Sequence, residues 1–87
     1  MYGVVQEVNL KNRLFSVKLE DVNYSVCFMR TPIKLELGAV LFGSFKCYGM
    51  TNLETEEMGK EILVDILHLL ISENTASYYL ADTSPKV

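Results

Sequence analysis

The chain has 87 residues, of which 49% are hydrophobic and 22% charged, and its formal net charge is −3. This length is enough for one small domain, and the apolar content excludes a chain that is disordered throughout. No window approaches the roughly 18 consecutive apolar residues of a membrane span, so we expect no membrane partner. Met1-Tyr2-Gly3 runs directly into strand-like sequence, without the basic region that opens a signal peptide, and we expect a cytoplasmic location.

The first thirty residues have the pattern of a three-stranded β-meander. Apolar, β-branched runs separated by short polar turns predict strands at Tyr2–Leu10, Leu14–Glu20 and about Val22–Arg30. In the second strand the side chains predicted to face the core are Phe15, Val17 and Leu19. In the third strand we expect Val22, Tyr24, Val26 and Phe28 to face the core, and Asn23, Ser25, Cys27 and Met29 to face outward.

The middle of the chain predicts one long strand followed by a turn region. Thr31-Pro32 ends the third strand, because proline cannot donate a hydrogen bond to a ladder. Ala39–Met50 predicts the fourth strand, and Gly43 within it is typical of a bulge or of tight coiling. The segment Thr51–Glu61 is polar and acidic, and Glu57-Met58-Gly59-Lys60 within it predicts a β-turn.

Glu61–Ile71 fits two different structures. As a helix it places Glu61, Asp65, His68 and Ser72 on one face and leucines and isoleucines on the other, so a helix at 61–72 on a four-stranded sheet is one alternative. As a strand it is almost continuously apolar and provides the fifth strand that closes a barrel. We favour the strand, because an open four-stranded sheet would leave unpaired edges.

The C-terminal residues lose this periodicity. We expect Tyr78-Tyr79-Leu80 to pack back as a short element and the last five residues to be frayed. The expected organisation is one domain over residues 1–74 and a C-terminal tail over residues 75–87. The expected fold class is all-β, or β-rich α+β, with a five-stranded barrel and a short C-terminal appendage.

Four stretches carry a resemblance to a known family. The runs GVVQEV, LFSVKL, YSV and LELGAVLFGSFK, with Leu35, Gly38 and Gly43 in a Leu-x-x-Gly-x-x-x-x-Gly step, resemble small oligonucleotide/oligosaccharide-binding (OB) barrels of the S1 and cold-shock kind. The resemblance covers roughly residues 2–71 and implies a binding module for single-stranded nucleic acid. The stretch RLFSVKLE has a single Phe, at a core position, where the cold-shock signature has exposed stacking Phe residues, so that feature does not carry over.

The charges are distributed unevenly between the two halves of the chain. Residues 1–50 carry six basic and four acidic residues, 6 − 4 = +2, whereas residues 51–87 carry two and seven, 2 − 7 = −5. A basic front half is compatible with phosphate contacts by a chain that is acidic overall. The candidate residues for binding single-stranded DNA or RNA are Lys11, Arg13, Lys18, Arg30, Lys34, Lys46 and, for base stacking, Tyr48.

The excess of apolar residues suggests a protein partner as the alternative. A barrel this small cannot bury both faces of Glu61–Ile71, and an outward apolar face needs covering by the C-terminal segment or by another protein. The candidate interface residues, for a homodimer or another protein–protein contact, are Leu63, Leu67, Leu69, Ile71, Tyr78 and Tyr79.

The sequence offers no pattern of catalytic or metal-binding residues. It has no Gly-rich phosphate loop and no nucleophile elbow, and the acidic stretch from Glu54 to Glu61 lacks the spacing of a calcium loop. His68 has no nearby partner for acid–base work. Cys27 and Cys47 lie in separate apolar runs, where we expect buried free thiols rather than a disulfide or zinc ligands. We therefore expect a protein that is not an enzyme and has no cofactor.

Overall fold

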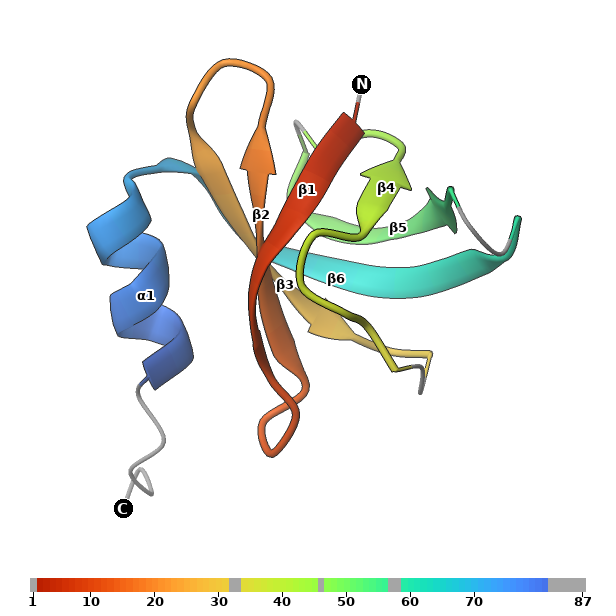
Figure 1. Ribbon diagram of the computed structural model, residues 1–87, viewed down its shortest axis with the longest axis horizontal. Coiled ribbons are helices and arrows are strands. Elements are labelled where there is room, and N and C mark those ends of the chain that lie inside the picture. The colour runs from red at the N-terminus through yellow and green to blue at the C-terminus, as the bar shows by residue number, and fades with distance from the viewer. Residues whose placement is uncertain (1, 32–33, 46, 57–58, 82–87) are drawn as a thin grey trace.

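The computed structural model describes residues 2–31, 34–45, 47–56 and 59–81 and contains six strands followed by one helix (Figure 1). The elements are β1 (Tyr2–Asn9), β2 (Leu14–Leu19), β3 (Tyr24–Met29), β4 (Val40–Phe42), β5 (Gly49–Thr55), β6 (Glu61–Ile71) and α1 (Glu73–Ala81). The strands form a closed barrel in the order β1-β2-β3-β6-β5-β4, with every pair antiparallel. The prediction of a small β-barrel with a short C-terminal appendage is confirmed.

Glu61–Ile71 is a strand, as favoured, and the alternative helix at 61–72 is wrong. β6 pairs with β5 on one side and with β3 on the other, so its backbone has ladder partners along most of its length. Two register irregularities against β3 shift its side-chain alternation. These shifts explain why the apolar residues of β6 do not follow a simple two-residue period.

The barrel has six strands rather than five because the predicted strand Ala39–Met50 divides into two. β4 ends at Phe42, and the chain then turns so that the Phe45 ring enters the core. It resumes as β5 at Gly49, which has a φ of 100° that a side-chain-bearing residue rarely adopts. The first residues of the polar segment, 51–55, are therefore part of β5, and the predicted turn at 57–60 lies partly outside the described residues.

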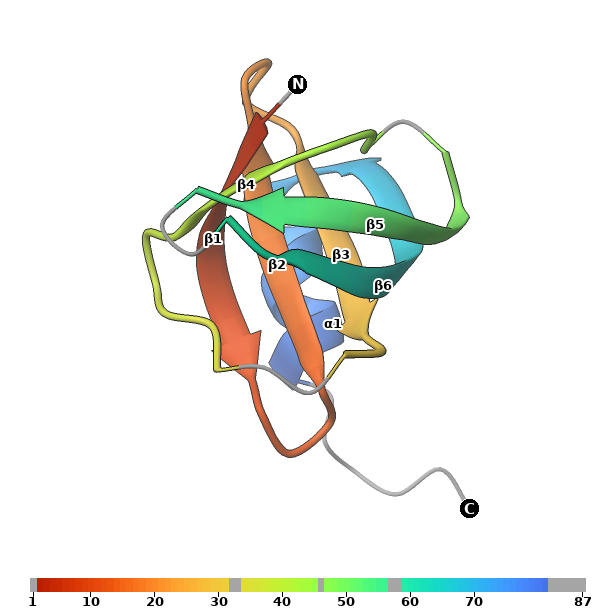
Figure 2. The ribbon, with the colours of Figure 1, turned by 90° about the vertical axis from the view of Figure 1, so that its right-hand side faces the viewer.

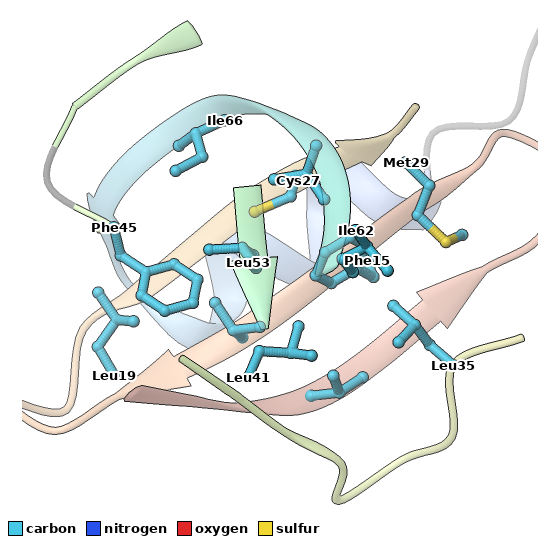
Figure 3. Packing of buried hydrophobic residues seen from close by; sticks show 13 residues of the cluster. Phe15, Leu19, Cys27, Met29, Leu35, Leu41, Phe45, Leu53, Ile62 and Ile66 are labelled. Atoms are coloured by element: carbon cyan, nitrogen blue, oxygen red, sulfur yellow. The ribbon is translucent and has the colours of Figure 1, made fainter. Parts of the chain in front are cut away.

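The barrel interior holds the main core, shown in Figure 3. Phe15, Val17 and Leu19 of β2 face into it, as predicted. Leu35, from the connection between β3 and β4, and Phe45, from the loop between β4 and β5, lie on opposite sides of this core. Because β3 and β4 end at opposite ends of the barrel, these two side chains close its two ends.

The predicted orientation of β3 is wrong. Ser25 lies opposite Val17 and Cys27 lies opposite Phe15, so the odd-numbered residues face the barrel interior. Tyr24 and Val26 face outward and are nevertheless buried, because α1 covers them. A strand buried on both faces shows no polar alternation, so its sequence could not indicate which face is inside.

The helix α1 lies on the outer surface of β1, β2 and β3, on the side of the barrel away from β5 (Figures 1 and 2). Ala76 and Leu80 pack on Tyr24 and Val26 in a second, smaller core. The Oγ of Ser72 accepts a hydrogen bond from the Thr75 N–H at 3.2 Å, which caps the first turn of the helix.

The prediction that Tyr78-Tyr79-Leu80 packs back as a short element is confirmed. The division into a domain over residues 1–74 and a tail over residues 75–87 stays a prediction, and its boundary falls within α1. The expected fraying concerns residues outside the described ranges. Within those ranges no helix has the length and apolar content needed to cross a membrane.

Candidate functional site

Four of the predicted nucleic-acid-binding residues lie at one end of the barrel. Lys11 and Arg13 are exposed in the turn between β1 and β2, whereas Arg30 and Lys34 are exposed in the connection that leaves β3. The Met29 N–H donates a hydrogen bond to the Arg13 carbonyl at 2.8 Å, which holds this turn against the end of β3. We call this group of four cations the basic end.

Arg30 is the one member of the basic end with side-chain partners among the described residues. Its Nη2 lies 3.1 Å from Oδ2 of Asp65, and its guanidinium lies 5.5 Å from the centre of the Phe28 ring. Its charge is therefore largely compensated by β6. Lys11, Arg13 and Lys34 make no ion pair with any described residue.

The other predicted nucleic-acid residues lie elsewhere. Lys18 is exposed on the outer face of β2, opposite Val4 and Tyr24. Tyr48 is exposed just before β5, two residues from Met50, which lies opposite Asp65 of β6. Lys46 lies outside the described residues. A single short groove therefore does not unite all seven predicted residues.

The four predicted interface residues of β6 do not form one outward row. Leu63 and Leu67 are on the outer surface, but Leu69 packs against the main core and Ile71 packs beneath α1. The cause is the pair of register irregularities described above, the second of which coincides with a φ of 54° at Leu70. Leu70 becomes exposed in their place.

The two predicted interface tyrosines of α1 differ in environment. Tyr79 stacks on His68 of β6 with the ring centres 3.7 Å apart, so this histidine packs against the helix. Tyr78 is exposed and meets Tyr79 edge-on. Beneath the helix, burial raises the pKa of the Tyr24 hydroxyl, and the charges of Glu73 and Glu7 raise it further.

Three apolar side chains gather on the outer surface of β5 and β6. Tyr48, Met50 and Leu67 are 68%, 64% and 40% exposed. Met50 lies opposite Asp65, and Gly49 lies opposite Ile66. Tyr48 and Leu67 are the next residues after the Gly49–Ile66 pair, one on each strand, so they lie close to each other. We call these three residues the β5–β6 patch. Sequence reasoning missed Met50 because it assigned the residue to the end of a longer strand.

A cavity of about 250 Å³ lies beside the basic end. It is lined by residues 34–40 together with Thr55 and Glu56. Its charged groups are one lysine, Lys34, and two glutamates, Glu36 and Glu56. These groups leave a net charge of 1 − 2 = −1, which does not favour an anion in the cavity.

The cysteines have opposite environments. Cys27 faces the barrel interior, and burial, with a smaller contribution from Asp65, raises the pKa of its thiol to about 12. Cys47 is exposed, so the expectation that both thiols are buried is wrong for this one, although both are free. Cys27 and His68 lie on opposite faces of the sheet and cannot act as a pair. Within the described ranges no three His, Cys, Asp or Glu side chains are placed to hold a metal ion.

Comparison of the chain with known protein families, with curated proteins and with solved structures finds no match in any of the three.

Proposed function

We propose that the chain is a non-catalytic protein-interaction or assembly module that binds its partner through the β5–β6 patch. The observation that carries the proposal is the exposure of Tyr48 and Met50, two large apolar side chains on a sheet surface that α1 leaves uncovered. Aromatic residues and methionine are enriched at protein interfaces, and apolar groups that gather on the surface of a small protein mark interaction sites. The Arg30–Asp65 ion pair beside Met50 supplies a polar border.

The position of α1 supports placing the site on β5 and β6. The closed antiparallel barrel is compatible with the OB-like scaffold that the sequence resembles. OB barrels bind oligonucleotides on the face of strands 2 and 3 and with adjoining loops. In this chain α1 covers the outer face of β2 and β3 and contacts β6 from His68 onward, which leaves β4, β5 and the earlier part of β6 as the free sheet surface.

Site-specific photo-crosslinking in the native host tests this proposal. A photoreactive residue replacing Met50 should give one discrete covalent adduct. A matched chain with the same residue at Asn74, exposed on α1, should not give that adduct. The same adduct from both positions, or no adduct from position 50, would contradict a partner at the β5–β6 patch.

A second candidate function is binding of single-stranded DNA or RNA, and the clustering of cations at the basic end favours it. Phosphate contacts by Lys11, Arg13 and Lys34 would release counterions, so affinity would fall steeply with salt.

Fluorescence anisotropy with short single-stranded oligonucleotides at low and high salt tests this second candidate. R13E should weaken binding several-fold and reduce the slope of log K against log salt by about one. K60E reverses an exposed lysine in the turn between β5 and β6 and should have little effect. Absence of binding at low salt would remove nucleic acid from consideration.

A further inference from the structure

The two turns that flank β2 carry opposite charges at opposite ends of the barrel. The turn before β2 contains Lys11 and Arg13, and the turn after it contains Glu20 and Asp21. The six residues of β2 separate the turns by about 20 Å, at about 3.3 Å per residue. In both ribbon views they project from the two ends of the molecule (Figures 1 and 2).

The two turns are built alike. Each displays one aliphatic side chain beside its charges: Leu10 is 62% exposed and Val22 is 72% exposed. Each has one non-glycine residue in the left-handed region, Arg13 with a φ of 59° and Val22 with a φ of 65°. None of the four charges forms an ion pair with another described residue.

Val22 is the least expected residue of the two turns. A β-branched residue in the left-handed region is strained, and asparagine or glycine would adopt this conformation at lower cost. The valine gains nothing from burial, because most of its side chain is in water. A strained and exposed residue of this kind points to a contact outside the folded chain.

We propose that copies of this chain assemble head to tail, with the turn after β2 of one copy docking on the turn before β2 of the next. Glu20 and Asp21 then face Lys11 and Arg13 of the neighbour, and the two aliphatic side chains meet between them. Because the two surfaces differ, the contact is heterologous and builds rings or open chains rather than closed pairs. The proposal uses the ends of the barrel and does not depend on the β5–β6 patch.

The surrounding charges agree with this polarity. Glu73 adds negative charge near the turn after β2, where Lys18 compensates in part, whereas Arg30, near the turn before β2, is paired with Asp65. The contact area of two turns is small compared with the roughly 1,200 Å² of a stable complex, so the association is weak. It is also strongly salt-dependent, because all four charges are exposed.

Sedimentation velocity over a concentration series tests the proposal at about 10 mM and about 1 M salt, where charges act over about 30 Å and about 3 Å. At low salt the average mass should rise with concentration above the 9.9 kDa of one chain, and at high salt it should return to that value. A monomer at every concentration in low salt would overturn the proposal.

Charge reversal distinguishes head-to-tail assembly from other modes. K11E/R13E makes both ends acidic and E20K/D21K makes both ends basic, so each variant alone should associate at least ten-fold more weakly than the native chain. An equimolar mixture should recover association, because each variant presents the end that the other needs. Association that persists in both separate variants, or a mixture without recovery, would contradict the proposal.

A matched control removes the effect of net charge. E54K/E56K changes the net charge by the same amount as E20K/D21K, but at the end of β5 and the residue that follows it, where both glutamates are exposed. Because both turns that flank β2 stay native in this control, it should associate alone as the native chain does, and a loss of association as large as that of E20K/D21K would overturn the proposal. V22N relieves the backbone strain and should raise the melting temperature while weakening assembly several-fold. Unchanged assembly by V22N would show that the aliphatic contact is wrong.

Discussion

The barrel has two outer surfaces, one that the helix α1 covers and one that it leaves exposed. Over β1, β2 and β3 the helix α1 buries Tyr24 and Val26, so β3 is covered on both of its faces. Over β5 and β6 no described segment covers Met50 and Leu67, which stay exposed. Because both surfaces carry large apolar side chains, apolar content alone does not determine which surface is buried. The helix determines it, and the uncovered surface is the one available to a partner.

The largest expected effect comes from placing a charge on each surface in turn. V26D puts an unpaired carboxylate beneath α1 and should lower the free energy of unfolding by at least about 3 kcal/mol, because the charge is desolvated without a partner. M50D puts the same group on the β5–β6 patch and should change it by less than about 1 kcal/mol. Urea denaturation followed by circular dichroism measures both. Equal losses would show that the β5–β6 patch is also covered in solution.

A smaller effect compares two positions of α1 itself. L80A removes a buried side chain and should cost about 2 to 3 kcal/mol, because it leaves a cavity against Tyr24 and Val26. Y78A removes an exposed ring of the same helix and should cost less than about 0.5 kcal/mol. The same denaturation experiment gives both values. If Tyr78 proves as costly as Leu80, the helix packs through a different face.

The two cysteines, one buried and one exposed, make the free energy of unfolding depend on pH in a way that can be measured. The pKa of Cys27 is raised from 9.0 to about 12 in the folded chain, so folding binds its proton more tightly. The stabilisation from this thiol is complete below pH 9, is lost as pH rises toward 12, and has fallen by roughly 1 kcal/mol at pH 10. C27A should flatten the dependence of unfolding free energy on pH between 8 and 10, whatever its absolute stability.

Labelling provides the matching control. A thiol reagent should modify the exposed Cys47 rapidly in the folded protein and Cys27 only after unfolding, because the thiolate is the reactive form. Equal labelling rates would contradict the buried position of Cys27.

The smallest expected effect concerns the ion pair on the uncovered surface. R30A should reduce the unfolding free energy by about 0.5 kcal/mol or less, because the Arg30–Asp65 pair is in water and such pairs contribute little. Addition of salt should reduce even this difference. A loss as large as that of L80A would show that the guanidinium is desolvated by its contact with Phe28.

The sequence predicted the barrel because its signals are local. The alternation in β2 and the apolar run of β6 are each explained by a strand with one or two buried faces. The division between β4 and β5 was not predictable in this way, because Phe45 reads as one more apolar strand residue although it turns into the core. The orientation of β3 depended on α1, whose contacts join residues some fifty positions apart in the chain.

The candidate site was harder to predict for the same reason. The basic end brings Arg13 beside the end of β3 through a main-chain hydrogen bond that no pattern in the sequence indicates. The register irregularities of β6 turn Leu69 inward, so a two-residue period assigned it to the wrong surface. Met50 was obscured by the missed start of β5. The charge of each residue was readable from the sequence, but the exposure of Cys47 and the grouping of side chains in space were not.

The three-residue strand β4 has a consequence for how the barrel moves. It is joined to β1 by the pairs from Tyr2–Phe42 to Val4–Val40 and to β5 by only two pairs, whereas β6 is held along both edges. Cooperative units with few main-chain bonds open at the lowest free energy. We therefore expect the barrel to open first at β4, and the amide protons there to exchange with solvent sooner than those of β2, β3 and β6. Loss of the β4 pairs would convert the closed barrel into an open sheet with β1 and β5 at its edges.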